Sequence, residues 1–355
     1  MSQDTLSDVL RTVRLRGAVF FYVSGGREWA AESPAAKDIA SAVMPGAEHV
    51  MEYHVVIAGD CWAGIVGQPP VRLNAGDIVL FAQGDSHVIS SAPGMRAEPN
   101  VAWYYEAKID QLPIRVAYDG TSGPTAAEPG QSGLTTIVCG FISYDAKPFN
   151  PLIAALPRML HLRASDAGAW VAHFLQQAVS ESQASRPGGE AMLARMSEML
   201  FVDAVRRYVE ILPPEGTGWL AGLRDRFVGR ALALLHEKPA EAWTIDELGR
   251  QVGLSRSALH ERFVQFVGQP PMQYLAQWRM QVASGLLRSS NATVATIALE
   301  VGYDSEAAFA RAFKRLVGMP PAAWRRALND KQDTDSATAA ESATARQPID
   351  PISTR

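Results

Sequence analysis

The last third of this 355-residue sequence contains one pattern twice, and this repeat constrains the fold more than any other feature. The first copy comprises Val252-Gly253-Leu254-Ser255, Ala258, Phe263, Gly268 and Pro270-Pro271. The second copy comprises Val301-Gly302-Tyr303, Ser305, Ala308, Phe313, Gly318 and Pro320-Pro321. The two phenylalanines, like the two glycines that follow them, are 50 positions apart, and one extra residue near Asp304 keeps the copies aligned. The repeat predicts two similar helical units in tandem.

The first copy has the local chemistry of a helix-turn-helix. We expect Thr244 to cap a helix over Ile245–Val252, because its hydroxyl can accept a hydrogen bond from a free N–H of the first turn. Gly253 supplies the positive φ that ends this helix. Ser255 then caps a second helix over Arg256–Val267.

The second copy follows the same plan. Its first helix is expected over Val294–Val301 and ends at Gly302. Asp304 or Ser305 then caps a helix over Glu306–Leu316. A single helix-turn-helix could belong to a plain helical bundle, but two in register favour DNA binding.

The segment between the copies explains why two units occur in one chain. Met272–Arg288 is an uninterrupted helical pattern of 17 residues, which corresponds to a rod of ~26 Å. Successive major grooves on one face of DNA are ~34–36 Å apart. A rigid helix of this length could place two recognition helices in neighbouring grooves.

The charge distribution agrees with a polyanionic partner for this part of the chain. Residues 220–328 carry 14 Lys and Arg against 9 Asp and Glu, although the whole chain has a net charge of −4. A positive segment in an otherwise acidic chain favours contact with nucleic acid. The excess is modest, so the charge supports the repeat and does not replace it.

Residues 225–327 resemble the DNA-binding domain of the AraC/XylS family of bacterial regulators. The matching motifs are Gly253-Leu254-Ser255-Arg256-Ser257-Ala258-Leu259, Ile297-Ala298, Val301-Gly302-Tyr303, Phe309-Ala310-Arg311-Ala312-Phe313-Lys314 and Gly318-Met319-Pro320-Pro321. The resemblance implies that the helices at 256–267 and 306–316 enter adjacent major grooves. It also implies a transcription regulator, more often an activator, that contacts RNA polymerase.

The resemblance places the base-reading positions on Ser257, His260, Glu261, Ala307 and Arg311. Arg311 is the strongest candidate, because a guanidinium can bond both acceptors of guanine. Glu261 could accept from cytosine or face away from the bases, and Ala307 offers only an apolar contact.

Other residues of the two units are candidates for the phosphate backbone. Ser255 and Ser305 head helices whose N-termini suit phosphates, and Glu306 lies on the exposed face of the second recognition helix. The candidate phosphate contacts among the cations are Arg256, Arg279 and Lys314. The alternative for these three is an ordinary solvated surface.

The N-terminal part of the chain, residues 18–145, is predicted to be β. Short apolar runs are separated by Gly and Pro, which predicts a closed or double-layered β domain. The expected strands are Ala18–Val23, His54–Ile57, Asp77–Phe81, Val101–Ala107 and Thr135–Phe141. Asp119–Gly133 is rich in Gly, Ser, Pro and Thr and is expected to be a mobile loop.

Gly76–His87 resembles the second cupin motif, with Ala82 in place of its proline, and His54–Gly59 resembles the end of the first. Residues 10–212 as a whole resemble the cupin-type sensor domain of some AraC-like regulators, which implies a small-molecule pocket. His54 and His87 are candidate ligand or metal residues, with His49 and Glu52 nearby. The expected His-x-His is absent and Ser91 takes the usual asparagine position, so a barrel without metal stays the alternative.

The chain has two cysteines, Cys61 and Cys139, both in this domain. Two cysteines without a CxxC pair argue against a zinc finger and fit a reducing compartment. Buried thiols are usually inert. The alternative is oxidant sensing through a Cys61–Cys139 disulfide or modification of one thiol.

The sequence therefore predicts a two-domain α+β chain. A cupin-like β-barrel with following helices occupies 10–212, a linker 213–222, a DNA-binding domain 223–328 and a disordered tail 329–355. Helices over 169–179 and 192–209 are expected to form a homodimer contact, with one of Leu200 and Phe201 facing away from the barrel. No apolar run is long enough to cross a membrane, and no secretory signal is visible, so we expect a cytoplasmic protein.

Two competing functions remain at this point. A cupin enzyme with a helical appendage would need a complete metal set, and the sequence offers an incomplete one. An architectural DNA-binding protein would not need a ligand-binding barrel. We expect a regulator without enzymatic activity that responds to a small-molecule or oxidant effector.

Overall fold

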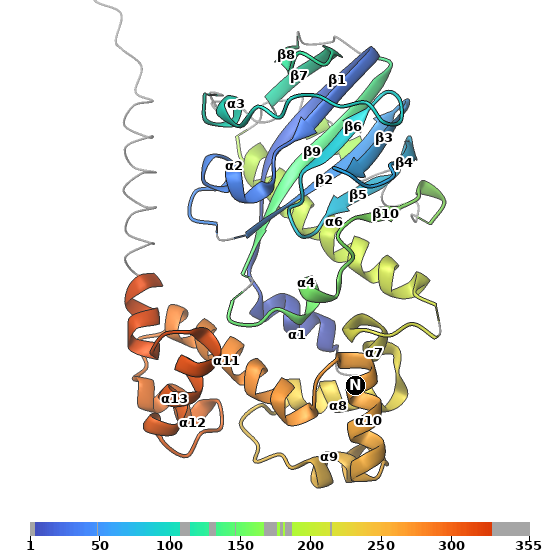
Figure 1. Cartoon of the computed structure of the whole chain (residues 1–355). Helices are drawn as coiled ribbons and strands as arrows, with labels where there is room; N and C mark the ends of the chain where they lie inside the picture. The colour runs from blue at the N-terminus through green and yellow to red at the C-terminus, as the bar shows by residue number, and fades with distance from the viewer. Residues whose placement is uncertain are drawn as a thin grey trace, which may run out of the picture.

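A computed structural model describes residues 4–47, 49–106, 114–127, 133–145, 147–166, 176–177, 180–181, 187–213 and 215–328. A curved β-sheet forms one part of the molecule, and a group of helices forms the other (Figure 1). Within the described residues, no helix is long and apolar enough to span a bilayer. The predicted tail, 329–355, lies outside the described residues.

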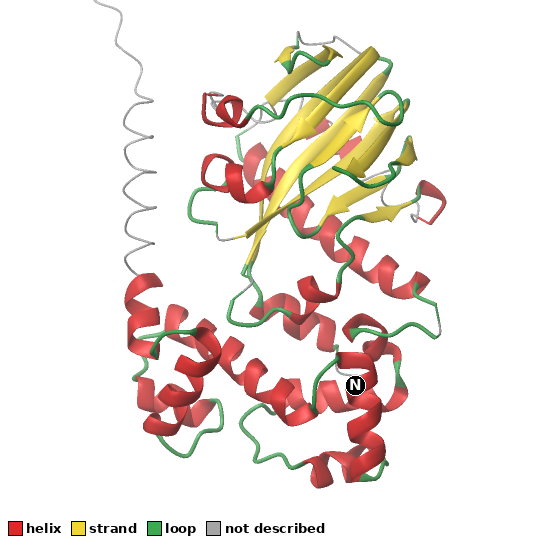
Figure 2. Cartoon of the chain, viewed as in Figure 1, coloured by secondary structure: helices red, strands yellow, loops and turns green. Residues whose placement is uncertain are grey.

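The N-terminal part is built around one strongly curled sheet (Figure 2). Its strands follow the order β10-β5-β2-β9-β1-β6-β3-β4, and β7 pairs in parallel with β1 and antiparallel with β8. Their bounds are β1 (Leu15–Ser33), β2 (His49–Ala58), β3 (Asp60–Ile65), β4 (Val71–Asn74), β5 (Ile78–Phe81), β6 (His87–Ser90), β7 (Ile114–Gly120), β8 (Thr125–Ala126), β9 (Thr135–Tyr144) and β10 (Leu160–Leu162). The predicted cupin domain is confirmed, as an open half-barrel.

One helix lies along a face of this sheet: the 23-residue α6 (Gly189–Ile211) packs against β1, β9 and β10. Helices α1 (Thr5–Thr12) and α4 (Pro151–Ala155) lie between the sheet and the C-terminal helices (Figure 1). Helix α2 (Ala36–Val43) packs against β1 and β2, and α3 (Val101–Glu106) packs against α2. Because side chains alternate along a strand, each central strand serves two cores. In β9, Val138 and Ile142 face the helices, whereas Cys139 and Phe141 face the inside of the curled sheet.

The C-terminal part is helical throughout. It consists of α7 (Trp219–Arg224), α8 (Arg226–Glu237), α9 (Ile245–Val252), α10 (Arg256–Val267), α11 (Pro271–Ser289), α12 (Val294–Glu300) and α13 (Glu306–Val317). The predicted caps are confirmed: the side chains of Thr244, Ser255 and Ser305 each accept from a backbone N–H three residues on. Gly253 and Gly302 have φ of 81° and 85°, which suits the glycines predicted to end the first helix of each unit.

Helix α11 is shared by both helix-turn-helix units. Its first half contributes Tyr274 and Trp278 to the core of the first unit, and its second half contributes Ala283 and Leu287 to the core of the second. With 19 residues it is ~28 Å long, close to the predicted rod. The two units are therefore joined by a helix that is buried at both ends.

Some expectations need correction. The predicted strand Val101–Ala107 is wrong over residues 101–106, because Asn100 accepts a hydrogen bond from the N–H of Trp103 and starts α3. The predicted loop 119–133 contains the short strand β8, and its residues 128–132 are not described. Four residues of the predicted linker 213–222 belong to α7, whose Trp219 is buried. The predicted helix 169–179 lies almost wholly outside the described residues.

Candidate DNA interface and effector cavity

The first recognition helix, α10, presents one polar face to solvent. Its inner face is fixed by Leu259 and Phe263, which are fully buried. The predicted DNA contacts lie on the opposite side and are exposed: Ser255, Arg256, Ser257, His260 and Glu261. This face can therefore enter a major groove without disturbing the core.

The second recognition helix, α13, repeats this arrangement. Phe309 and Phe313 are fully buried against α11 and α12. The predicted contacts are exposed here as well: Ser305, Glu306, Ala307, Arg311 and Lys314. Helices α10 and α13 lie toward opposite ends of α11, as the two-groove argument requires (Figure 1).

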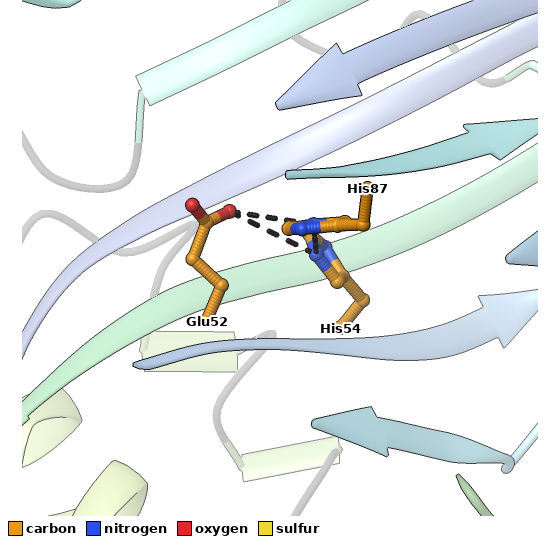
Figure 3. A group of neighbouring side chains, drawn as sticks. All are labelled: Glu52, His54 and His87. Atoms are coloured by element: carbon orange, nitrogen blue, oxygen red, sulfur yellow. Dashed lines mark hydrogen bonds and ion pairs between the residues drawn. The ribbon is translucent and has the colours of Figure 1, made fainter. Parts of the chain in front are cut away.

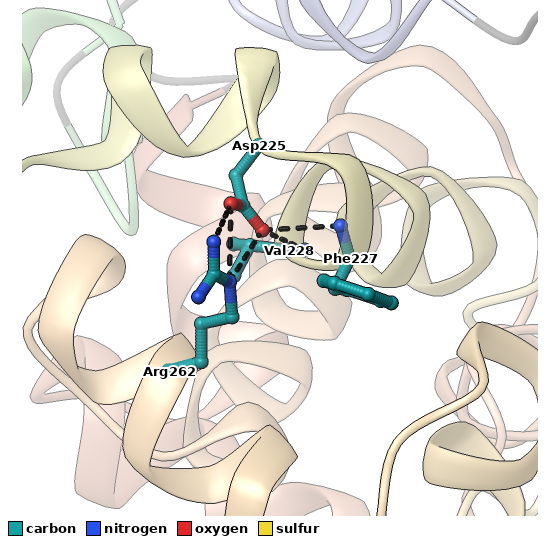
Figure 4. A network of polar contacts seen from close by, with 4 residues as sticks. All are labelled: Asp225, Phe227, Val228 and Arg262. Atoms are coloured by element: carbon teal, nitrogen blue, oxygen red, sulfur yellow. Dashed lines mark hydrogen bonds and ion pairs between the residues drawn. The ribbon is translucent and has the colours of Figure 1, made fainter. Parts of the chain in front are cut away.

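An ion pair fixes α10 to its neighbour. Asp225 caps α8 by accepting hydrogen bonds from the N–H groups of Phe227 and Val228, at 3.0 and 2.9 Å (Figure 4). The same carboxylate receives Nε and Nη2 of Arg262 from α10, at 3.0 and 2.5 Å. Burial alone would raise the pKa of Asp225, but Arg262 and the two N–H groups hold it below its ordinary value. Arg262 thus positions the recognition helix.

Arg279 has a different environment from the other predicted contacts. It is half-buried, and its guanidinium donates to the carbonyl oxygens of Pro239, Glu241 and Gly302 at 2.7, 2.8 and 3.0 Å. These bonds join α11 to the segment before α9 and to the turn after α12. The phosphate contact of Arg279 stays a prediction, but the structure already gives this side chain a bracing role.

The β domain touches α11 directly. At the end of β9, Asp145 accepts from Nη1 of Arg288 at 2.5 Å. A few residues later, the N–H of Phe149 donates to Oε1 of the buried Gln281 at 2.9 Å. One apolar core runs across this boundary, from the sheet through α1 and α4 to α7 and α8. The residues that directly follow β9 are thus bonded to α11, the helix shared by both helix-turn-helix units.

A cavity opens on the inner face of the curled sheet. Its walls are largely aromatic and include Phe21, Trp29, Trp103, Tyr104, Tyr118 and Phe141. Its empty space measures about 530 Å³, part of which is open to solvent. The indole N–H of Trp29 is buried there without a hydrogen-bond partner. An apolar cavity with a few convergent polar groups is typical of a small-molecule site.

Glu52, His54 and His87 converge at one side of this region (Figure 3). Nε2 of His54 is 2.8 Å from Nε2 of His87, and Oε2 of Glu52 is 4.0 Å from the first and 3.5 Å from the second. Strand β2 carries the first two residues and β6 the third. The relative exposure of each residue is 5% or less.

Burial controls the charge of this cluster. It raises the pKa of Glu52 to about 8 and lowers the pKa of His87 to about 4. Burial and the neighbouring His87 lower the pKa of His54 well below its ordinary value. At neutral pH the three side chains are therefore uncharged, which suits a buried site. Two imidazoles and a carboxyl are also a donor set that fits a transition metal.

The comparisons with known proteins agree with this architecture. Residues 4–210 match a family model described as Cupin, and residues 248–327 match one described as a helix-turn-helix domain. A protein of Streptomyces lividans, named as an AraC-like transcription regulator, is 32% identical over 326 residues, or 91% of this chain and 98% of that protein. The chain belongs to the AraC family. It is a DNA-binding transcription regulator, as its sequence predicts.

Two further relatives of this AraC-family regulator are similar to it. The transcriptional regulator AlkR of Acinetobacter baylyi is 28% identical over 329 residues, which are 91% of this chain and 99% of AlkR. The DNA-binding domain of AdpA, solved in complex with a target DNA, is 28% identical and covers 31% of this chain and 97% of its own. The TM-score of that match is 0.30, so the family assignment rests on the sequence matches.

The two cysteines of this AraC-family regulator are free and buried in the same apolar core. Burial raises the pKa of the Cys61 thiol to about 12 and also raises that of Cys139. A thiol reacts with oxidants as the thiolate, so this environment disfavours reaction. Oxidant sensing by these thiols stays a prediction, and the surroundings favour the alternative of inert packing.

The sequence did not identify every residue that shapes these sites. Arg262 looked like one more exposed cation, because a partner 37 positions away leaves no local signal. Trp103 and Tyr104 were placed on a strand, although Pro99-Asn100 before them is a helix-start signal that could have revealed α3. Glu52 was noted near the first motif, and the structure brings it to His87 across the sheet.

Proposed function

We propose that this AraC-family regulator reads two successive major grooves of an operator and that a molecule bound in the cavity changes its affinity for that operator. The observation that carries the proposal is the continuity of β9. Cys139 and Phe141 line the cavity, and a few residues later Asp145 is bonded to Arg288 on α11. A ligand that shifts β9 would act directly on the helix that sets the positions of α10 and α13.

The coupling has a simple thermodynamic form. A ligand can change the free-energy difference between two conformations only by the difference between its binding free energies for them. The contacts proposed to differ between the arrangements are those at the boundary, where Asp145 is bonded to Arg288 and Phe149 to Gln281 in this structure. The proposed effector is a small molecule or an oxidant.

Selection of bound sequences from random DNA tests the proposal. The full-length protein should select two half-sites on one face of the helix, about one helical turn apart. Repeating the selection with candidate effectors should change the amount of bound DNA and leave the selected sequence unchanged. A protein that binds random competitor as well as any selected site would contradict the proposal.

The variant Asp145→Asn tests the coupling. It weakens the ion pair with Arg288, so DNA affinity should respond less to the effector while sequence preference is retained. Asp60→Asn is the matched control, because Asp60 forms an exposed ion pair with Arg72 on the outer strands β3 and β4. Equal effector responses in Asp145→Asn and wild type would show that the signal takes another route.

Three further parts of the proposal concern partners and activity. We infer that the protein activates transcription through contact with RNA polymerase, because its family supports an activator.

We also infer a homodimer through α6, whose Met192 and Met199 are seven residues apart and 51% and 57% exposed. Leu200 and Phe201 are both buried, so neither offers an exposed side chain for this contact. Sedimentation of Met199→Glu against wild type would test the dimer.

We propose regulation by binding and not by catalysis. This is supported by two relatives that match over 91% of the chain and are named as transcription regulators. Turnover of a small molecule by the purified protein, at a rate that Glu52→Gln abolishes, would contradict this part.

A further inference from the structure

We propose that residues 92–106 form a lid over the aromatic cavity and that the ion pair between Arg96 and Glu32 holds this lid shut. The inference rests on the proposed function for its purpose, because the lid would control the entry and release of the effector. Its evidence comes from contacts within the β domain and does not depend on DNA binding. The segment connects β6 to α3 and passes in front of the sheet (Figure 1).

The rings of Trp103 and Tyr104 separate two hollows. Both residues line the cavity on the inner face of the sheet. Both also line a second hollow, whose empty space measures about 320 Å³ and is partly open to solvent. Ala97 and Asn100, from the same segment, line this second hollow as well. A molecule that reaches the cavity from the second hollow must therefore displace the two rings of α3.

The segment is attached to the domain by side chains and not by its backbone. Before it begins, the N–H of Ser91 donates to the carbonyl oxygen of Trp29 at 2.9 Å. Among the described residues, no backbone–backbone hydrogen bond joins residues 92–106 to a strand. In α3, Trp103 and Tyr104 are half-buried and the other four residues are exposed. A segment with few buried groups opens at a lower free energy than the strands beneath it.

Two polar contacts hold the segment closed. Nε and Nη2 of Arg96 donate to the two carboxylate oxygens of Glu32 on β1, at 2.7 and 2.6 Å. The Glu32 side chain is 3% exposed, whereas that of Arg96 is 58% exposed. The hydroxyl of Tyr105 lies 2.8 Å from that of Ser41 on α2 and donates to the carbonyl oxygen of Asp38 at 3.3 Å. Because a buried carboxylate is costly without a partner, Glu32 favours the closed position of Arg96.

The inner side of the lid rests on rings that line the cavity. The ring centroids of Trp103 and Tyr104 are 5.6 and 6.3 Å from that of Phe21. Phe21 in turn lies 6.0 Å from Phe141 on β9. A molecule bound in the cavity against Trp103 or Tyr104 would add contacts that exist only when the lid is closed. Effector binding and lid closure would therefore favour each other.

The two cysteines report separately on lid opening and on unfolding. Cys139 lines the cavity, whereas Cys61 is fully buried and is not among the described residues that line it. Full-length protein without effector is treated with N-ethylmaleimide in mildly alkaline solution, and mass spectrometry follows the modification of each cysteine. Opening of the lid should expose Cys139 alone, whereas unfolding of the domain exposes both thiols.

Arg96→Gln removes the ionic contact of the lid. It should accelerate modification of Cys139 about 5-fold, the factor expected for loss of a partly exposed ion pair, and leave Cys61 unchanged. Tyr105→Phe removes the second contact but keeps the ring, and it should accelerate modification of Cys139 about 2–5-fold.

The matched control is Arg158→Gln. Arg158 makes a bidentate contact with Asp85 and is also 58% exposed, so it resembles Arg96 in chemistry and in exposure. This pair joins the turn between β5 and β6 to the segment before β10 and lies outside the lid. The control variant should be modified at Cys139 at the rate of wild type.

Two results would overturn the proposal. One is equal modification of Cys139 in Arg96→Gln and wild type, and the other is equal acceleration of Cys139 and Cys61, which would indicate opening of the whole domain. If Cys139 reacts in none of the proteins, hydrogen exchange decides. Amides of residues 92–106 must then exchange faster in Arg96→Gln than in wild type, while those of β1 and β9 exchange alike.

Operator binding separates failure of this inference from failure of the proposed function. Unchanged modification of Cys139 in a protein whose operator binding responds to an effector removes the lid alone. Faster modification of Cys139 in a protein whose operator binding responds to no effector keeps the lid and removes effector control.

Discussion

The ion pair between Asp225 and Arg262 should measurably stabilise the first DNA-reading unit, and Arg262→Gln is the change that tests it. The guanidinium of Arg262 makes a bidentate contact with the carboxylate of Asp225. The Asp225 side chain is mostly buried, whereas that of Arg262 is 42% exposed. Hydrogen bonds to charged groups contribute ~1.5–3 kcal/mol when buried, whereas exposed ion pairs contribute ~0.2–1 kcal/mol. For this half-exposed pair we expect a loss of about 1–2 kcal/mol in the free energy of unfolding.

Urea unfolding followed by tryptophan fluorescence measures this loss. A loss of this size changes the unfolding equilibrium by a factor of about 5–30. Helix α10 keeps its buried Leu259 and Phe263, so the variant should still fold. Arg256→Gln, on the same helix, is the control, because its 3.5 Å pair with Asp246 is exposed and should change stability by less than ~0.5 kcal/mol.

The pH dependence gives an independent check. The pKa of Asp225 is held below its ordinary value, so its pairing stabilises the fold above the unfolded pKa of ~3.9. That contribution is lost as the pH falls through the folded pKa. The difference between wild type and Arg262→Gln should therefore shrink in acid. A difference near zero at pH 7, or no coupling with Asp225→Asn in a double-mutant cycle, would refute the reasoning.

Two further predictions concern α13 and the core of the first unit. Arg311→Ala should cost ~1–3 kcal/mol on the selected operator and relax preference at one base pair, whereas Lys314→Ala should weaken all sequences alike; competition binding measures both. His236 is buried against Tyr274, and burial lowers its pKa to about 3. Below pH ~6.5 this histidine binds a proton in the unfolded chain but not in the folded chain, so the free energy of unfolding should fall by about 2 kcal/mol between pH 7 and pH 5. His236→Gln should lack this pH-dependent loss, which denaturation curves of the variant and wild type at both pH values measure.

The helical third was predictable because its rules are local. Caps such as Ser255 act within three residues, and Gly253 ends a helix through its own backbone, so a short stretch of sequence contains the necessary information. The same holds for β2 and β9, whose apolar runs are buried on both faces. Helix α3 was missed because the aromatic run Trp103-Tyr104-Tyr105 resembles a strand, and the single cap at Asn100 decides otherwise.

The long-range parts of the sites could not be predicted from the sequence. Asp225 and Arg262 are far apart in the chain, and their pairing depends on how α8 crosses α10. Arg279 is a residue type that often contacts phosphate, yet its guanidinium donates hydrogen bonds to three carbonyl oxygens from distant segments. Sequence patterns identify which surfaces are polar. The packing of the helices determines which Arg and Lys side chains are bonded within the protein and which are available to contact DNA.

Both helix-turn-helix cores include residues of α11, so the distance between the recognition helices α10 and α13 and the rotation between them cannot change independently. Each residue of an α-helix adds ~1.5 Å and ~100°. Removing or adding one residue between Trp278 and Ala283 would thus turn α13 by more than a quarter of a circle while moving it little. Removing or adding a base pair between the half-sites of the operator likewise rotates one half-site about the DNA axis relative to the other. The protein and its DNA are consequently matched in helical phase as well as in chemistry.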